Sequence, residues 1–231
     1  MAIPAFRALG AFASGPTSCT PGLPAGHTTD DILVLIVECA AAETPNTPAE
    51  WTSLGSATSG TDVKLTVFIK RHDGSETAPT VDGTSNHVHA WIGAYSGVEN
   101  TGSPWLLGSF TAQATSTVTY TGLTTEFADA LVLLLTAIGD NANDPENLSG
   151  YTNANLSDLT DRDDEAETTG TGGGLGFADG GKASAGATGN STCTHDNAVD
   201  AVSVHLALYS STVSLPPLSA VDPAVYQRRM A

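Results

Sequence analysis

The sequence predicts an all-β protein: a two-sheet β-sandwich of jelly-roll-like type with an extended C-terminal arm. Runs of β-branched and aliphatic residues recur along the chain, separated by clusters of Pro, Gly, Asn and Ser. No stretch shows the sustained apolar period of 3.6 residues that marks an amphipathic helix. The strand-like segments also fall into two similar sets, and two such sets can bury their apolar faces against each other.

The first strand is expected at 31–38, a continuous apolar run typical of a strand covered on both faces. The second, at 63–70, alternates apolar and polar residues, so Val63, Leu65 and Val67 should share one face. The third, at 87–95, should end in a turn at Gly97. The remaining strands are expected at 116–120, 130–138, 174–178 and 200–209. Only the segment 127–135 could form a helix instead of a strand, and its β-branched and apolar residues favour the strand.

These segments form a pseudo-repeat. The matched pairs are 30–37 with 129–136, 51–52 with 151–152, 64–68 with 174–177, and 88–95 with 202–209. We therefore expect one sandwich domain at 1–213, with pseudo-repeats at about 24–98 and 123–210. The second repeat should carry a longer loop around 158–174. A unit that occurs only twice is too few for a solenoid, so facing sheets are the favoured arrangement.

The last segment, 214–231, holds three prolines and shows no strand period, which predicts an extended arm. Val225 and Tyr226 could anchor it, and Arg228 and Arg229 could contact the acidic surface of a neighbouring subunit. This interpretation implies a homo-oligomer. The alternative is a disordered tail.

Composition excludes several classes of partner. The formal net charge is −17 with only 8 Lys and Arg, which argues against direct binding of nucleic acid. The longest apolar runs are far shorter than the roughly 20 residues of a membrane helix. No targeting segment is recognisable, so synthesis in a cytoplasm is expected. Cys19, Cys39 and Cys193 lack metal-site spacing; buried thiols are expected, and a disulfide stays open.

No catalytic or cofactor-binding residue is predicted. Ser96 stands one place too late for a GxSxG nucleophile turn, and the glycines at 170–176 do not match a phosphate-binding loop. His205 lies in an apolar strand and is interpreted as a core histidine. A hydrolase would require two carboxylates or a Ser–His pair in a pocket.

Two groups of residues could in principle hold a metal. His87 and His89 are two residues apart and should face the same side of a strand, but no partnering Glu or Cys has a recognisable spacing. Six acidic residues lie between Asp158 and Glu167, without the Gly and Glu positions of an EF-hand. A solvated loop is the favoured interpretation there, and a looser calcium site is the alternative. No metal site is therefore predicted.

Aromatic residues suggest one further possibility. Trp51, Trp91 and Trp105 could form a platform for a sugar, although Trp91 lies in the middle of a strand and is expected in the core.

Four phrases resemble a group of poorly characterised structural proteins of bacteriophages and prophages. They are PAGHTTDD at 24–31, PAEWTSLG at 48–55, LTVFIKR at 65–71 and NHVHAWIGAYSGV at 86–98. Glu50 stands where the group has Gly before the Trp. The resemblance covers roughly residues 1–98 and brings no functional residues.

The resemblance implies a non-enzymatic virion protein built on a β-sandwich and made in the host cytoplasm. Its expected partners are other capsid or tail proteins and further copies of itself. The charge and the short apolar runs argue against nucleic acid and membrane as partners, and no cofactor is expected. Capsid decoration is the favoured role, and a tail accessory or carbohydrate-binding adhesion module is the alternative.

Overall fold

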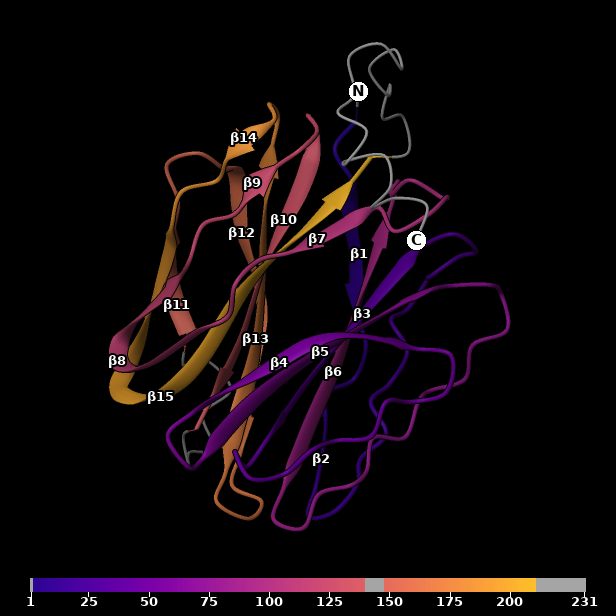
Figure 1. The fold of residues 1–231 in the computed structure, drawn as a ribbon. Coiled ribbons are helices and arrows are strands. Elements are labelled where there is room, and N and C mark those ends of the chain that lie inside the picture. Colours follow the sequence, from indigo (N-terminus) through magenta and orange to yellow (C-terminus); the bar gives the residue numbers. More distant parts are fainter. Residues whose placement is uncertain (1, 140–147, 211–231) are drawn as a thin grey trace.

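The computed structural model describes residues 2–139 and 148–210. Within these ranges all regular secondary structure is β-strand, and two antiparallel sheets pack face to face (Figure 1). The predicted all-β, two-sheet sandwich is confirmed. None of the described segments is a helix able to cross a membrane. The predicted arm at 214–231, with Val225, Tyr226, Arg228 and Arg229, lies outside the described residues.

Each sheet is built from one half of the chain. The first contains β1 (Ala5–Leu9), β2 (Ala13–Gly15), β3 (Ile32–Cys39), β4 (Thr52–Ser59), β5 (Val63–Arg71) and β6 (Val88–Ser96). The second contains β7 (Trp105–Leu107), β8 (Thr111–Tyr120), β10 (Ala130–Ile138), β11 (Leu148–Thr152), β12 (Ser157–Glu167), β13 (Gly173–Lys182) and β15 (Ser191–Tyr209). A small sheet pairs β9 (Thr124–Thr125) with β14 (Gly186–Ala187).

The strand orders of the two sheets match. The first runs β6-β3-β5-β4 and the second β15-β10-β13-β12. Each half also opens with two strands that pair with its last strand: β1 and β2 with β6, and β7 and β8 with β15. The structural repeat therefore begins earlier in each half than the sequence pattern indicates. β11, which contains Tyr151, has no counterpart before β4, so the expected match of Tyr151 with Trp51 does not extend to the fold.

The two halves are related by an approximate two-fold axis. β5 lies against β10 and β15, and its counterpart β13 lies against β3 and β6. Ile32 pairs with Tyr95 in the first sheet and Leu131 pairs with Leu208 in the second. Tyr95 therefore corresponds to Leu208, one residue before the Tyr209 expected from the sequence. The difference matters because a one-residue shift along a strand reverses the face of every side chain.

The core between the sheets consists of alternate, inward-facing residues. They are Ile32, Val34, Ile36, Val63, Leu65, Val67, Ile69, Leu131, Leu133, Leu135, Leu175, Phe177, Val202, Val204, Leu206 and Leu208, with Trp91 and Tyr95. The outer faces of β3 and β10 are buried as well, under connecting segments and further strands. This double burial explains the continuous apolar runs of both strands.

The acidic run at 158–167 is not the loop expected from its composition. It forms β12, an edge strand paired with β13 through two irregularities in register. Asp164 and Ala166 are buried, whereas Asp158, Asp161 and Asp163 are exposed. An edge strand tolerates this pattern because one of its sides stays in water, so charge alone does not indicate a loop there.

Glu50 has a left-handed backbone conformation, with φ of 66°. Gly is the residue that adopts such a φ without steric strain. The Glu50 side chain is exposed, and its Oε2 lies 2.8 Å from Nζ of Lys70. An exposed ion pair contributes at most about 1 kcal/mol.

We expect Glu50→Gly to stabilise the protein by up to about 1 kcal/mol, because relief of about 1–2 kcal/mol of left-handed strain exceeds the lost ion pair. Glu50→Ala is the matched control: it loses the ion pair but keeps the strain, so it should be slightly destabilising. Urea unfolding of the three proteins measures both differences. A Gly variant no more stable than the Ala variant would contradict the argument.

Candidate functional site

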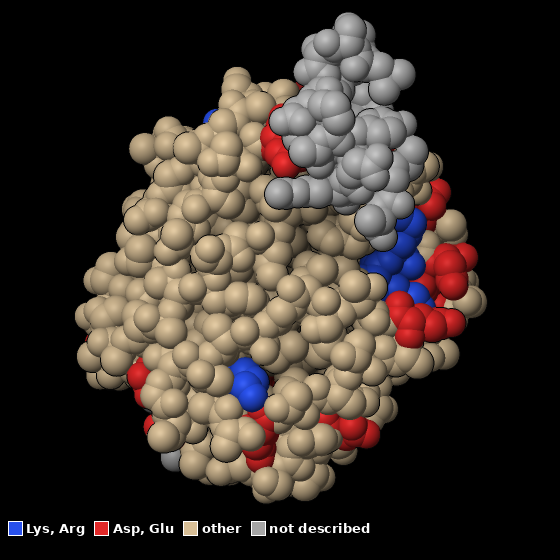
Figure 2. Space-filling model, viewed as in Figure 1, with Lys and Arg blue, Asp and Glu red and all other residues tan. Residues whose placement is uncertain are grey.

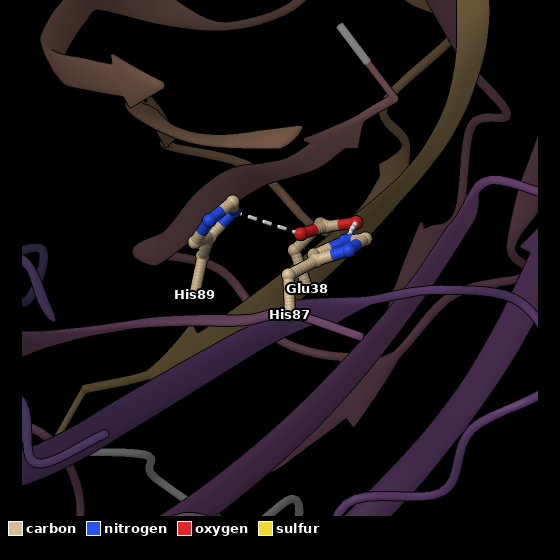
Figure 3. A group of neighbouring side chains, drawn as sticks. All are labelled: Glu38, His87 and His89. Atoms are coloured by element: carbon tan, nitrogen blue, oxygen red, sulfur yellow. Dashed lines mark hydrogen bonds and ion pairs between the residues drawn. The ribbon is translucent and has the colours of Figure 1, made fainter. Parts of the chain in front are cut away.

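A carboxylate and two imidazoles meet inside the sandwich, with no exposed side-chain surface. Glu38 lies on β3, His89 on β6, and His87 immediately before β6 (Figure 3). The Glu38 carboxylate lies between the two rings, with Oε1 3.0 Å from His87 Nε2 and Oε2 2.9 Å from His89 Nδ1. Among the described residues, these three form the one group of His, Cys, Asp or Glu that could hold a metal ion.

The register of the sheet brings the three side chains together. Glu38 pairs directly with His89 across β3 and β6, so both point to the same face. His87 precedes His89 by two residues and shares that face. The face is the inner one, since Glu38 follows Ile36 and His89 precedes Trp91 in the same alternation.

Neighbouring residues fix the orientation of His87. The Thr171 backbone N–H donates to Asn86 Oδ1 at 2.9 Å, which identifies that atom as the amide oxygen. His87 Nδ1 lies 3.1 Å from the same oxygen and 3.2 Å from Thr171 Oγ1, so a protonated Nδ1 can donate to either oxygen. His87 Nε2 then faces Glu38 with either a second proton or a free lone pair.

His89 and Glu38 approach each other without a hydrogen bond. Glu38 Oε2 and both ring nitrogens of His89 are buried and lack a hydrogen-bond partner among the described residues. A buried polar atom without a partner costs roughly 1–3 kcal/mol.

Gly173 of β13 provides the space for the carboxylate. A Cβ at this position would lie 2.5 Å from Glu38 Oε2, closer than atoms of real side chains approach. The second sheet therefore contributes directly to the shape of the site.

The pKa of His87 is set by opposing effects. Burial lowers it, but the hydrogen bond to Glu38 and the negative charges of Glu38, Glu43 and Asp62 together raise it above its usual value. The negative charge of Glu38 therefore favours a cation on its His87 side.

In the second half of the chain, the positions equivalent to Glu38 and His89 hold apolar residues. Glu38 corresponds to Ala137, which pairs with Val202 just as Glu38 pairs with His89. Ala137 and Val202 belong to the same inter-sheet core. The sheet can therefore be built with two apolar residues here, and its geometry does not require Glu38 and His89.

The predicted common orientation of His87 and His89 is confirmed, but sequence spacing did not identify Glu38 as their partner. Glu38 is 49 residues from His87, so only the strand register joins them. A signal was present in the sequence: a carboxylate at the end of an otherwise apolar, doubly covered strand requires a buried partner.

The other sequence candidates behave differently. Trp51 is 7% exposed and packs on the outer face of the first sheet, whereas Trp105 lies on β7 in the second sheet. They do not form an exposed sugar platform. Trp91 lies in the core, as predicted, and its Nε1 donates to the Gly10 carbonyl at 2.7 Å.

Cys19, Cys39 and Cys193 are buried free thiols, the favoured expectation. Burial raises their pKa values to about 12, 12 and 11, which leaves them protonated at neutral pH.

A Ser–His pair occurs on the outer side of the second sheet. Ser191 Oγ lies 2.8 Å from His205 Nε2, and neither side chain is exposed. Burial lowers the pKa of His205 to about 4, so its ring is a poor general base. The ring stacks on Tyr120, with 5.6 Å between centroids. His205 is therefore a core histidine, as predicted from its apolar strand.

His205 should make the protein acid-sensitive. Its folded pKa of about 4 lies below the unfolded value of 6.5, so the unfolded state binds the extra proton between these pH values. Stability should be complete above pH 6.5 and fall by roughly 3 kcal/mol as pH decreases to 4. His205→Gln should lose less stability over this interval, as measured by urea unfolding at several pH values. Parallel pH profiles of the two proteins would refute this.

A second buried charge joins the two sheets at their β1–β12 edge. Asp179 of β13 is 1% exposed and receives two hydrogen bonds from Arg162, at 2.8 and 2.7 Å. The Arg162 guanidinium lies 4.5 Å from the ring centre of Phe6, on β1 of the first sheet. The hydrogen bonds raise the pKa of Arg162, and burial raises that of Asp179.

Arg162→Met should destabilise the fold by about 3–5 kcal/mol, because it leaves Asp179 as an uncompensated buried charge. Asp179 corresponds to Ile69, since it pairs with Leu133 as Ile69 pairs with Val34. Adding Asp179→Ile to Arg162→Met should therefore recover most of the lost stability in thermal or urea unfolding. A double variant as unstable as the single one would show that the ion pair is not the cause.

Comparisons with protein-family models, with curated proteins and with solved structures found no match.

Proposed function

We propose that the protein is a non-catalytic structural subunit of a bacteriophage particle, bound to the capsid as a decoration or cement protein. The observation that supports this role best is a broad uncharged face over β4 and β8 (Figure 2). β4 contains no charged residue, and none occurs between Glu99 and Glu126, a stretch that includes β7 and β8. Depletion of charge is typical of the centre of protein interfaces.

The uncharged face stands out against the rest of the molecule. The chain has a formal net charge of −17, and in Figure 2 most of the charged side chains in view lie at the margins. Thr, Ser and Ala dominate the exposed residues of β4 and β8. Such a surface can contact a neighbouring subunit without removing charges from water.

The face also presents the edge of β4, which is last in the strand order of the first sheet. On β8 the Gln113 carbonyl accepts from Ser59 Oγ, and the Thr119 N–H and C=O bond to the Gln113 side chain, so β4 is the more open edge. Unpaired edges can add a strand from another chain, and charged side chains prevent such pairing.

The approximate two-fold axis provides an internal comparison. It relates β4 to β12, which carries the acidic run, and it relates β7 and β8 to β1 and β2, of which β1 carries Arg7. The charged side is protected from edge pairing, whereas the uncharged side is suited to contact. We place the contact with the particle on the β4–β8 side.

Particle composition tests the role. Phage particles purified from a strain that carries this gene should contain the protein in many copies by quantitative mass spectrometry. Electron cryomicroscopy should place it on the capsid surface. Absence from purified particles would refute the virion role, whereas density on the tail would refute capsid decoration.

Rebinding to particles that lack the protein tests the face. Ala114 is exposed on β8, and Ala114→Glu should weaken rebinding at least about tenfold, because a buried uncompensated charge costs more than about 1.4 kcal/mol. Ala78→Glu is the matched control, an equally exposed alanine on the connection between β5 and β6. Equal affinity of the two variants in a sedimentation assay would rule out this face.

A further inference from the structure

Glu38, His87 and His89 form a buried cluster of three side chains that could hold a metal ion. Their ligand atoms all lie within 4.8 Å of one another, and none of the three side chains is exposed. A tetrahedral ion with bonds of about 2.0 Å holds its ligand atoms about 3.3 Å apart. The ligand atoms, within 4.8 Å of one another, would have to approach by at most about 1.5 Å to reach that spacing.

The orientation of His87 favours a metal ligand. Its Nδ1 lies within hydrogen-bonding distance of Asn86 Oδ1 and Thr171 Oγ1, and its Nε2 is directed at the carboxylate. Ligand histidines in proteins usually donate their second ring N–H in this way to an oxygen, which fixes the ring and raises its basicity. Asn86 is in turn held by the Thr171 N–H.

The contact between His89 and Glu38 gives an independent indication. Nδ1 and Oε2 lie 2.9 Å apart, yet no hydrogen bond satisfies either atom among the described residues. A contact this short is favourable when Nδ1 carries a proton, which makes it an ion pair, or when a metal ion lies between the two atoms. A metal ion bound to both atoms satisfies them together.

The polar residues are not needed to form the sheet. Ala137 and Val202 occupy the positions equivalent to Glu38 and His89 in the second half, and they pack in the same core. Burying the Glu38 carboxylate away from water has a considerable desolvation cost. A bound ion would offset this cost.

From these observations we propose that Glu38, His87 and His89 bind one divalent transition-metal ion of the zinc class. Two imidazole nitrogens and one carboxylate oxygen suit Zn²⁺, whereas Ca²⁺ and Mg²⁺ require sets of oxygen ligands. The ion ties the end of β3 to the start of β6 beneath Gly173 of β13. The three residues supply three ligands of a tetrahedral ion and leave the fourth position to a water molecule. We assign the ion a structural role because none of the three side chains is exposed.

The test uses the full chain, stripped with a chelator and dialysed against Zn²⁺, Ca²⁺ or Mg²⁺. Elemental analysis should find one Zn²⁺ per chain. At a hundredfold excess over Kd, Zn²⁺ should raise the melting temperature by roughly 5–10 °C. Ca²⁺ and Mg²⁺ should produce no shift. A wild-type chain that retains no Zn²⁺ and shows no shift would overturn the proposal.

Three variants separate metal binding from folding. Glu38→Gln preserves the shape of the side chain and should weaken Zn²⁺ binding at least tenfold. Glu38→Ala with His89→Val copies the second half, so it should fold without metal and show no Zn²⁺-dependent shift. His27→Gln, outside the site, should bind Zn²⁺ as the wild type does.

Isothermal titration calorimetry and circular dichroism give the two readouts for each variant. If Glu38→Gln folds and binds Zn²⁺ with unchanged affinity, the ion lies elsewhere and the assignment is wrong. The result is independent of the virion role, since metal content and stability are measured on the isolated protein.

Discussion

Burial of the central strands on both faces is the constraint on which the rest of the structure depends. β3 and β10 each face the opposite sheet on one side and a covering layer on the other. A polar side chain in these strands, or in the buried parts of β13 and β15 that flank β10, has no access to water and must find its partner inside the protein. Asp179 meets Arg162, and His205 meets Ser191. Glu38 meets two histidines, of which only His87 forms a hydrogen bond with it.

The approximate two-fold axis shows which of these polar residues the fold itself requires. Equivalent positions in the two sheets have similar packing. Even so, the position of Glu38 is occupied by Ala137 in the second half, and the position of Asp179 is occupied by Ile69 in the first half. Both polar residues therefore occupy positions that an apolar residue fills in the other half. The two sides of the sandwich differ likewise, one with an acidic edge at β12 and one without charge at β4 and β8. Features that break the internal symmetry are better candidates for function than features that obey it.

Sequence patterns predict the strands that consist of apolar residues and miss the strands that consist mainly of polar residues. The runs that form β3 and β10 were identified because double burial leaves only aliphatic residues there. β4 and β12 were not identified, since edge strands rich in Ser, Thr or Asp resemble loops. Glu38 was missed as a partner of His87 because the register that joins them depends on strand pairing across 49 residues. The repeat was visible, but its exact register required the observed pairing of Leu131 with Leu208.

The division of the chain into two consecutive sheets has a consequence for biosynthesis. All strands of the first sheet leave the ribosome before the second sheet has been translated, and the inner side of that first sheet stays uncovered meanwhile. Nascent chains on neighbouring ribosomes would then expose the same apolar sheet face. Because the two halves share one strand order, such a half-chain could dock onto another half-chain in place of its own continuation. The inner side of the first sheet is covered only when residues 105–210 have added the second sheet.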